Sequence, residues 1–174
     1  VLFIGNSYTA VNDLPNTFRL LALSLGDTVN VAASTPGGYT FEGHTTYAPT
    51  LQAIEAQAWD HVVLQEQSQL PSFSPAQVQT QCYPFAAELV DLIRANDSCT
   101  QPVFYMTWGR QNGDASNCAS WPPVCTYDGM QARLRESYLE MAFANDAYAA
   151  PVGAAWKNVR DAHPAIVLYN ADQS

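Results

Sequence analysis

Short apolar runs alternate along this chain with longer segments whose apolar residues recur at helical spacing. The runs are too short for helices and predict strands at residues 1–4, 28–33, 61–64, 102–106 and 149–152. Helices are expected between them, near residues 13–26, 50–58, 76–95, 127–145 and 156–161. This alternation predicts an α/β fold: a three-layer α/β/α sandwich around a central parallel sheet of about five strands.

The chain has enough apolar residues for a full core. At 174 residues with 48% apolar content, residues 1–174 are expected to form a single domain. In the segment 127–145 the buried face is predicted from five residues at helical spacing, Met130, Leu134, Tyr138, Met141 and Ala142.

The charge balance excludes several classes of partner. Lys and Arg total 7 against 16 Asp and Glu, which gives a net charge of -9. Such a chain repels phosphate backbones and anionic lipid surfaces, so we expect neither a nucleic acid nor a membrane partner. Four cysteines and few lysines favour an exported protein, extracellular or periplasmic.

Two of the cysteines are placed for a disulfide. Cys118 and Cys125 bracket a proline-containing loop whose ends can approach each other, and we predict a bridge between them. Cys82 and Cys99 flank a predicted helix that would hold them roughly 20 Å apart, against a limit of about 7 Å. Their pairing requires that helix prediction to be wrong, and Cys82 with Cys118 or Cys125 is the alternative.

Polar or glycine-rich residues follow four of the predicted strands. Parallel strands end on one edge of a sheet, where open α/β folds place their chemistry. That edge would collect Ser7, the Gly37-Gly38 loop, residues 65–68 and residues 107–110. Ser7 is the candidate nucleophile. The alternative is that Gly5-Asn6-Ser7 is an ordinary turn, because these residue types are common in turns.

Three blocks of the sequence resemble those of a known family. Gly5-Asn6-Ser7, Gly38-Tyr39-Thr40 and Asp172-Gln173-Ser174 are similar, in order and approximate spacing, to conserved blocks of the SGNH superfamily of GDSL-type esterases. The resemblance spans the whole chain. It implies that Ser7 is the nucleophile, that the Ser7 and Gly38 N–H groups bind the oxyanion, and that Asp172 orients the catalytic base.

The chain departs from the family pattern in two places. The family has Gly-x-Asn-Asp after the third strand, where this chain has residues 65–68, Gln-Glu-Gln-Ser. The asparagine donor would then be replaced by the amide of Gln67, or alternatively of Gln65; some carbohydrate-esterase branches use Gln and Glu in this block. The histidine of the family's Asp-x-x-His pair would directly follow Ser174. We therefore expect that the sequence is trimmed at both ends and that it stops before the histidine that would act as the catalytic base.

Other residues at this edge have two interpretations each. Trp108 can offer a flat face to a sugar ring, or pack under the cysteine loop. Arg110 can bind a hydroxyl or carboxylate of a substrate, or be solvated. Glu66 can bind substrate or pair with Arg110, and His44 can line the pocket or bond to backbone.

The remaining histidines, His61 and His163, are expected to be structural or surface residues. No spacing of Cys or His is typical of a metal site, so we predict no metal and no cofactor.

Together these features predict a secreted serine esterase that removes a small acyl group, acetyl above all, from a carbohydrate or similar polar ester through an acyl-serine intermediate. The alternative is a catalytically impaired carbohydrate-binding protein on the same fold. A nucleotide-binding flavodoxin-like domain is disfavoured, because the turn at Gly5 lacks the further glycines of a phosphate loop.

Overall fold

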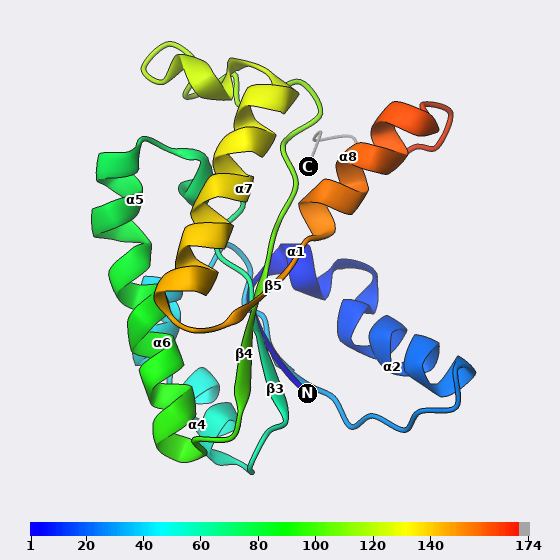
Figure 1. Ribbon diagram of the computed structural model, residues 1–174, viewed down its shortest axis with the longest axis vertical. Helices are drawn as coiled ribbons and strands as arrows, with labels where there is room; N and C mark the ends of the chain where they lie inside the picture. Colours follow the sequence, from blue (N-terminus) through cyan, green and yellow to red (C-terminus); the bar gives the residue numbers. More distant parts are fainter. Residues whose placement is uncertain (171–174) are drawn as a thin grey trace.

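The computed structural model describes residues 1–170, and a five-stranded parallel sheet forms its centre (Figure 1). The strands are β1 (Leu2–Ile4), β2 (Ala32–Ser34), β3 (His61–Leu64), β4 (Gln101–Tyr105) and β5 (Tyr148–Ala150), in the order β2-β1-β3-β4-β5. All five predicted strands are present, which confirms the α/β fold. The second strand begins later than residue 28, because the three residues of β1 pair only with Ala32–Ser34.

Within residues 1–170, eight α-helices connect and follow the strands. They are α1 (Ser7–Ala10), α2 (Leu14–Ser24), α3 (Phe41–Thr46), α4 (Ala48–Glu55), α5 (Pro75–Gln81), α6 (Tyr83–Asn96), α7 (Tyr127–Ala144) and α8 (Val152–Ala162). Short 3-10 turns lie at Val11–Asp13, Leu70–Ser72 and Pro122–Cys125. None of the helices within residues 1–170 combines the length and apolar content needed to cross a membrane.

The observed helices differ in detail from the predicted ones. The single helix expected over residues 76–95 is broken at Cys82, whose backbone has φ -127° and ψ -59°. Pro84 lies in the first turn of α6 and has no N–H to continue the α5 ladder, so two helices form instead of one. The helix α3 was not expected, and it begins where the Thr40 side chain accepts the Gly43 N–H at 3.2 Å.

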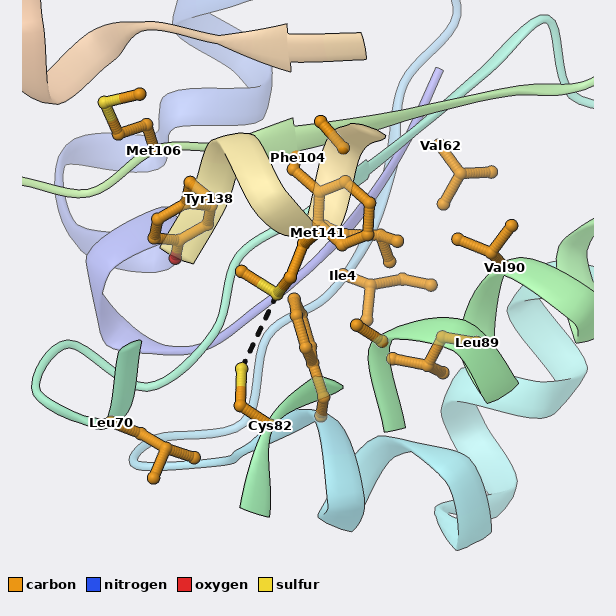
Figure 2. Packing of buried hydrophobic residues seen from close by; sticks show 14 of the residues in the cluster. Ile4, Val62, Leu70, Cys82, Leu89, Val90, Phe104, Met106, Tyr138 and Met141 are labelled. Carbon is orange, nitrogen blue, oxygen red and sulfur yellow. Dashed lines mark hydrogen bonds between the residues drawn. The ribbon is translucent and has the colours of Figure 1, made fainter. Parts of the chain in front are cut away.

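The hydrophobic core lies between one face of the sheet and the helices α4, α5, α6 and α7 (Figure 1). Alternate strand residues point to this face, so Leu2 and Ile4 are buried in it while Phe3 points to the other. Figure 2 shows Ile4, Val62 and Phe104 packed near side chains of α6 and α7. All five residues predicted for the buried face of the segment 127–145 are buried, which confirms that prediction.

The opposite face of the sheet meets α2 and α8 (Figure 1). Phe3 contacts Phe18 of α2 with ring centroids 5.8 Å apart, and an apolar cavity of about 370 Å³ lies beside them, bordered by Val63 and Val103. Three leucines of α2 are largely exposed: Leu20 at 50%, Leu21 at 60% and Leu23 at 54%. The helical spacing of α2 was therefore a correct signal for a helix, although its leucines stay outside the core.

Two of the four cysteines form a disulfide, and it is the predicted one. Cys118 and Cys125 form the expected disulfide, whereas Cys82 and Cys99 are free thiols. The alternative bridges from Cys82 are therefore wrong. Cys82 lies in the core, with its sulfur 3.5 Å from that of Met141 (Figure 2).

The central position of Phe104 leads to a prediction about stability. The side chain is fully buried and contacts Phe41 at 6.1 Å, so Phe104→Ala should lower the free energy of unfolding by about 3–5 kcal/mol through lost burial and a cavity. The matched control is Phe143→Ala, at a residue 92% exposed, which should change it by less than about 0.5 kcal/mol. Urea unfolding followed by circular dichroism measures both, and equal losses would contradict the core described above.

Candidate active site

Ser7 lies where the chain leaves β1 and begins α1. Gly5 and Asn6 are buried, and Ser7 is the first exposed residue of the turn. The side chain of Asn6 caps α1 by accepting the Tyr8 N–H at 3.1 Å. The sheet therefore presents the Ser7 hydroxyl at its carboxyl edge, where the sequence placed it.

Gln65, directly after β3, holds this turn in place through hydrogen bonds from inside the protein. Its Oε1 accepts the Asn6 N–H at 3.0 Å and the Thr9 hydroxyl at 2.8 Å. Its Nε2 donates to Asn6 Oδ1 at 3.0 Å and to the carbonyl of Glu66. Gln65 is 1% exposed, so it acts on the position of the serine turn rather than facing a ligand.

The backbone of Gly5 is enclosed as closely. A Cβ at this position would lie 2.7 Å from both Gln65 Oε1 and Thr9 Oγ1, which explains the glycine. The Gly5 carbonyl oxygen lies 2.9 Å from His44 Nε2, and His44 Nδ1 lies 2.7 Å from Thr50 Oγ1. His44 is fully buried, so it takes the backbone-bonding role of the two that the sequence left open. Burial lowers the pKa of His44, and the bond to Gly5 opposes that effect.

The loop of Gly38 is tied to the serine turn. Asn6 Nδ2 donates to the Tyr39 carbonyl at 2.8 Å. Gly38 itself is exposed and has φ +74°, a left-handed conformation that glycine adopts without strain. The hydrogen bonds among residues 1–170 use the N–H groups of Asn6 and Tyr8 but not those of Ser7 and Gly38.

Glu66 is inside the protein. Its carboxylate accepts the Phe41 N–H at 3.0 and 3.1 Å and the Gln67 N–H at 2.6 Å. Burial raises the pKa of Glu66 to about 8, and the two backbone N–H groups act against this rise. Of the two alternatives for Glu66, pairing with Arg110 is wrong, because the Arg110 guanidinium lies 3.6 Å from the buried carboxylate of Asp114 instead.

Gln67 is held by its own turn. Its side-chain oxygen accepts the N–H groups of Gln69 and Leu70 at 2.8 and 3.1 Å. Its NH₂ group makes one long contact, 3.3 Å to Gln69 Oε1. Of the two glutamines considered as a replacement for the family's asparagine, Gln67 therefore has the less committed amide nitrogen.

A cavity of about 340 Å³ borders Ser7. Trp108, after β4, lines this cavity. Its ring stacks on two other rings of the wall, with centroid distances of 4.9 Å to Tyr8 and 4.1 Å to Trp156. Tyr169 meets Trp156 edge-on at 5.4 Å. The other lining residues are Val11, Asn12, Val167, Leu168 and Asn170. Trp108 therefore borders the cavity without an open flat face, because Tyr8 and Trp156 stack on it, and its packing partners are these two rings rather than the cysteine loop.

Trp156 and Tyr169 were not singled out from the sequence. Their positions follow from the sheet topology, which the sequence did not predict: β5 pairs with β4, and α8 begins two residues after β5. A tryptophan on α8 is thereby brought to the exit of β4, where Trp108 lies. Sequence patterns alone gave no reason to place β5 beside β4.

The predicted carboxylate, Asp172, lies outside the described residues. The described chain ends at Asn170, which borders the same cavity as Ser7. Within residues 1–170, no group of three or more His, Cys, Asp or Glu side chains is arranged to hold a metal ion.

Several solved structures share this fold over most of the chain. A protein from Slackia heliotrinireducens that is assigned to the SGNH hydrolases is 30% identical, with a TM-score of 0.76, over 99% of this chain and 86% of its own. A DUF4886 family protein from Bacteroides uniformis is 19% identical, with a TM-score of 0.72, over 91% and 69%. The acetyl xylan esterase Axe2 from Geobacillus stearothermophilus, solved as a variant, is 16% identical, with a TM-score of 0.62, over 99% and 84%. No protein-family model matches the chain, and no curated protein matches it in sequence.

The contacts of Gln65 lead to a prediction about stability. Gln65→Met keeps the side-chain length but leaves the Asn6 N–H without its buried acceptor, so the free energy of unfolding should fall by about 1–3 kcal/mol. Gln52→Met, at an exposed position of α4, is the matched control and should be nearly neutral. Urea unfolding compares the two variants, and an unchanged midpoint for Gln65→Met would refute the positioning role.

The pKa of Glu66 leads to a prediction about pH. An acid whose folded-state pKa is raised from 4.5 to about 8 favours the folded state when protonated, so its contribution is complete below pH 4.5 and is lost as the pH rises through 8. Relative to Glu66→Gln, the wild-type protein should therefore lose several kcal/mol between these limits. Because His44 titrates in both proteins, their difference isolates Glu66.

Urea unfolding at intervals from pH 4.5 to 8.5 gives both profiles for this comparison. Glu88→Gln, at an exposed position of α6, serves as the control and should run parallel to wild type. Parallel profiles for Glu66→Gln and wild type would show that burial does not raise this pKa.

Proposed function

Because this chain belongs to the SGNH hydrolase family, we propose that it is a serine esterase that removes a small acyl group, acetyl in the first place, from a carbohydrate or similar polar ester. The observation that carries the proposal is the position of Ser7. Its exposed side chain stands at the carboxyl edge of the sheet and borders a cavity with an aromatic wall.

In the proposed reaction the Ser7 hydroxyl attacks the acyl carbon and the alcohol departs with a proton. Water then hydrolyses the acyl-serine and restores the hydroxyl. Serine needs a base within hydrogen-bond reach, held in one tautomer by a carboxylate. Asp172 takes the part of that carboxylate in this proposal, and the base is the histidine that the family pattern has three positions later.

The oxyanion formed during attack requires donors. We assign the N–H groups of Ser7 and Gly38, with the Gln67 amide as a third donor. Support comes from the neighbouring groups: the Asn6 and Tyr8 N–H groups are used by side chains, and the Gln65 amide is engaged inside the protein. Each well-placed donor contributes on the order of 3 kcal/mol to lowering the barrier.

The walls of the cavity support a sugar as the alcohol. Tyr8 and Trp156 stack on Trp108 and border the cavity with aromatic surface, against which the C–H faces of a pyranose pack. A cavity of about 340 Å³ is at the small end of ligand sites, which suits an acetyl group and one sugar ring. One protein of the same fold carries the description acetyl xylan esterase.

We further propose that the protein acts outside the cytoplasm, in the extracellular space or the periplasm. The disulfide between Cys118 and Cys125 supports this placement, since such bonds persist in oxidising compartments.

The test is hydrolysis of p-nitrophenyl acetate by the protein expressed from its full reading frame. Ser7→Ala should reduce turnover by at least about 10³-fold, because the nucleophile is lost while the fold remains. Ser24→Ala, at an exposed serine of α2, is the matched control and should hydrolyse the ester at the wild-type rate.

Undiminished turnover by Ser7→Ala would refute the assignment of the nucleophile. If wild type hydrolyses no ester but binds acetylated oligosaccharides, the alternative of a carbohydrate-binding protein on this fold is supported instead. The aromatic wall gives that alternative its physical basis, because it does not depend on Ser7 chemistry.

A further inference from the structure

A second cavity, also of about 340 Å³, adjoins the one at Ser7. Val167, Leu168 and Tyr169 line both cavities, so this short segment is the wall that they share. Gln111 and Arg160 border only the second cavity. The function proposed above gives this space no role.

Arg160 is held in place by two aromatic rings and a hydroxyl group. Its guanidinium carbon lies 4.2 Å from the ring centroid of Tyr127 and 5.6 Å from that of Tyr169. One guanidinium nitrogen donates to the Tyr169 hydroxyl at 3.3 Å, which in turn donates to the Gly109 carbonyl at 3.2 Å. Aromatic faces and a neutral hydroxyl orient the cation. The carboxylate of Asp128 interacts with it electrostatically, but Asp128 forms its ion pair with Lys157.

Two neighbouring cations, by contrast, form ion pairs with carboxylates. Lys157, on the same helix, contacts Asp128 and Asp161 at 2.7 and 2.8 Å. Arg110, at the exit of β4, lies beside Asp114. Within residues 1–170, Arg160 forms no ion pair with a carboxylate, although the chain carries 16 acidic residues. An oriented guanidinium in a cavity wall is suited to an anionic ligand.

The lining indicates which anion fits. A guanidinium fork matches the two oxygens of a carboxylate, and a single cation in a chain of net charge -9 is poorly suited to a doubly charged phosphate. Val167 and Leu168 offer apolar surface, and the Gln111 amide can bond to hydroxyls. We propose that this cavity binds a uronic acid residue, with its carboxylate on Arg160 and its ring against the shared wall.

This inference deepens the proposed function and rests on it for one step only. If Ser7 deacylates a sugar, the two adjoining cavities would hold neighbouring residues of one chain. The substrate would then be an acetylated polysaccharide that also carries uronic acid, with the ester at Ser7 and the carboxylate at Arg160. Binding of the uronate itself needs no turnover.

The test is a titration of the full-length protein with glucuronate and with glucose, followed by NMR chemical shifts at low ionic strength. Glucuronate should bind about three- to fivefold more tightly than glucose, as expected for one partly exposed ion pair. Arg160→Met should abolish the preference. Arg135→Met removes the same charge from an exposed position of α7 and should preserve it.

Three results would overturn the proposal: equal binding of both sugars, a preference that survives in Arg160→Met, or succinate bound as tightly as glucuronate. Gln111→Leu keeps the charge and should weaken both sugars, which tests the cavity even if Arg160→Met unfolds. A protein without esterase activity that still shows the Arg160-dependent preference would refute the proposed function while supporting this site.

Discussion

The side-chain amide of Gln65 is the contact on which the site's geometry depends. It follows β3, yet it bonds Asn6 through both its oxygen and its nitrogen, and Asn6 in turn reaches the carbonyl of Tyr39. One chain of hydrogen bonds thereby joins the exits of β1, β2 and β3. An amide suits this place because it both donates and accepts, and in a buried network each missing partner would be costly.

Glu66 extends this network toward the helices. Its carboxylate holds the first N–H of α3, and its own N–H donates to the Tyr138 hydroxyl of α7 at 3.2 Å. Gln65 and Glu66 thus form a buried polar layer between the serine turn and the apolar core. A carboxylate is expensive to bury, and the raised pKa of Glu66 reflects that cost. By accepting the Phe41 N–H, the Glu66 carboxylate links the segment that follows Gly38 to the exit of β3 at the centre of the sheet.

Much of this arrangement was readable from the sequence, because it depends on local patterns. The run His61–Leu64 was predicted at its observed bounds, Ser7 lies at the expected edge, and the disulfide joins the expected cysteines. Burial of Gln65 and Glu66 was not predicted, because polar residues at a strand exit become interior only through partners distant in sequence. The break at Cys82 was missed although Pro84 signals it, since the apolar spacing continues across it.

The aromatic wall depends on long-range folding in the same way. Its rings come from α1, from the exit of β4, from α8 and from the segment after α8, so the cavity at Ser7 exists only once the end of the described chain has packed onto its beginning. The chain of contacts from Arg160 through the Tyr169 hydroxyl to the Gly109 carbonyl fixes the last of these rings. Because Tyr169 borders both cavities, the guanidinium that orients it also sets the shape of the wall facing Ser7.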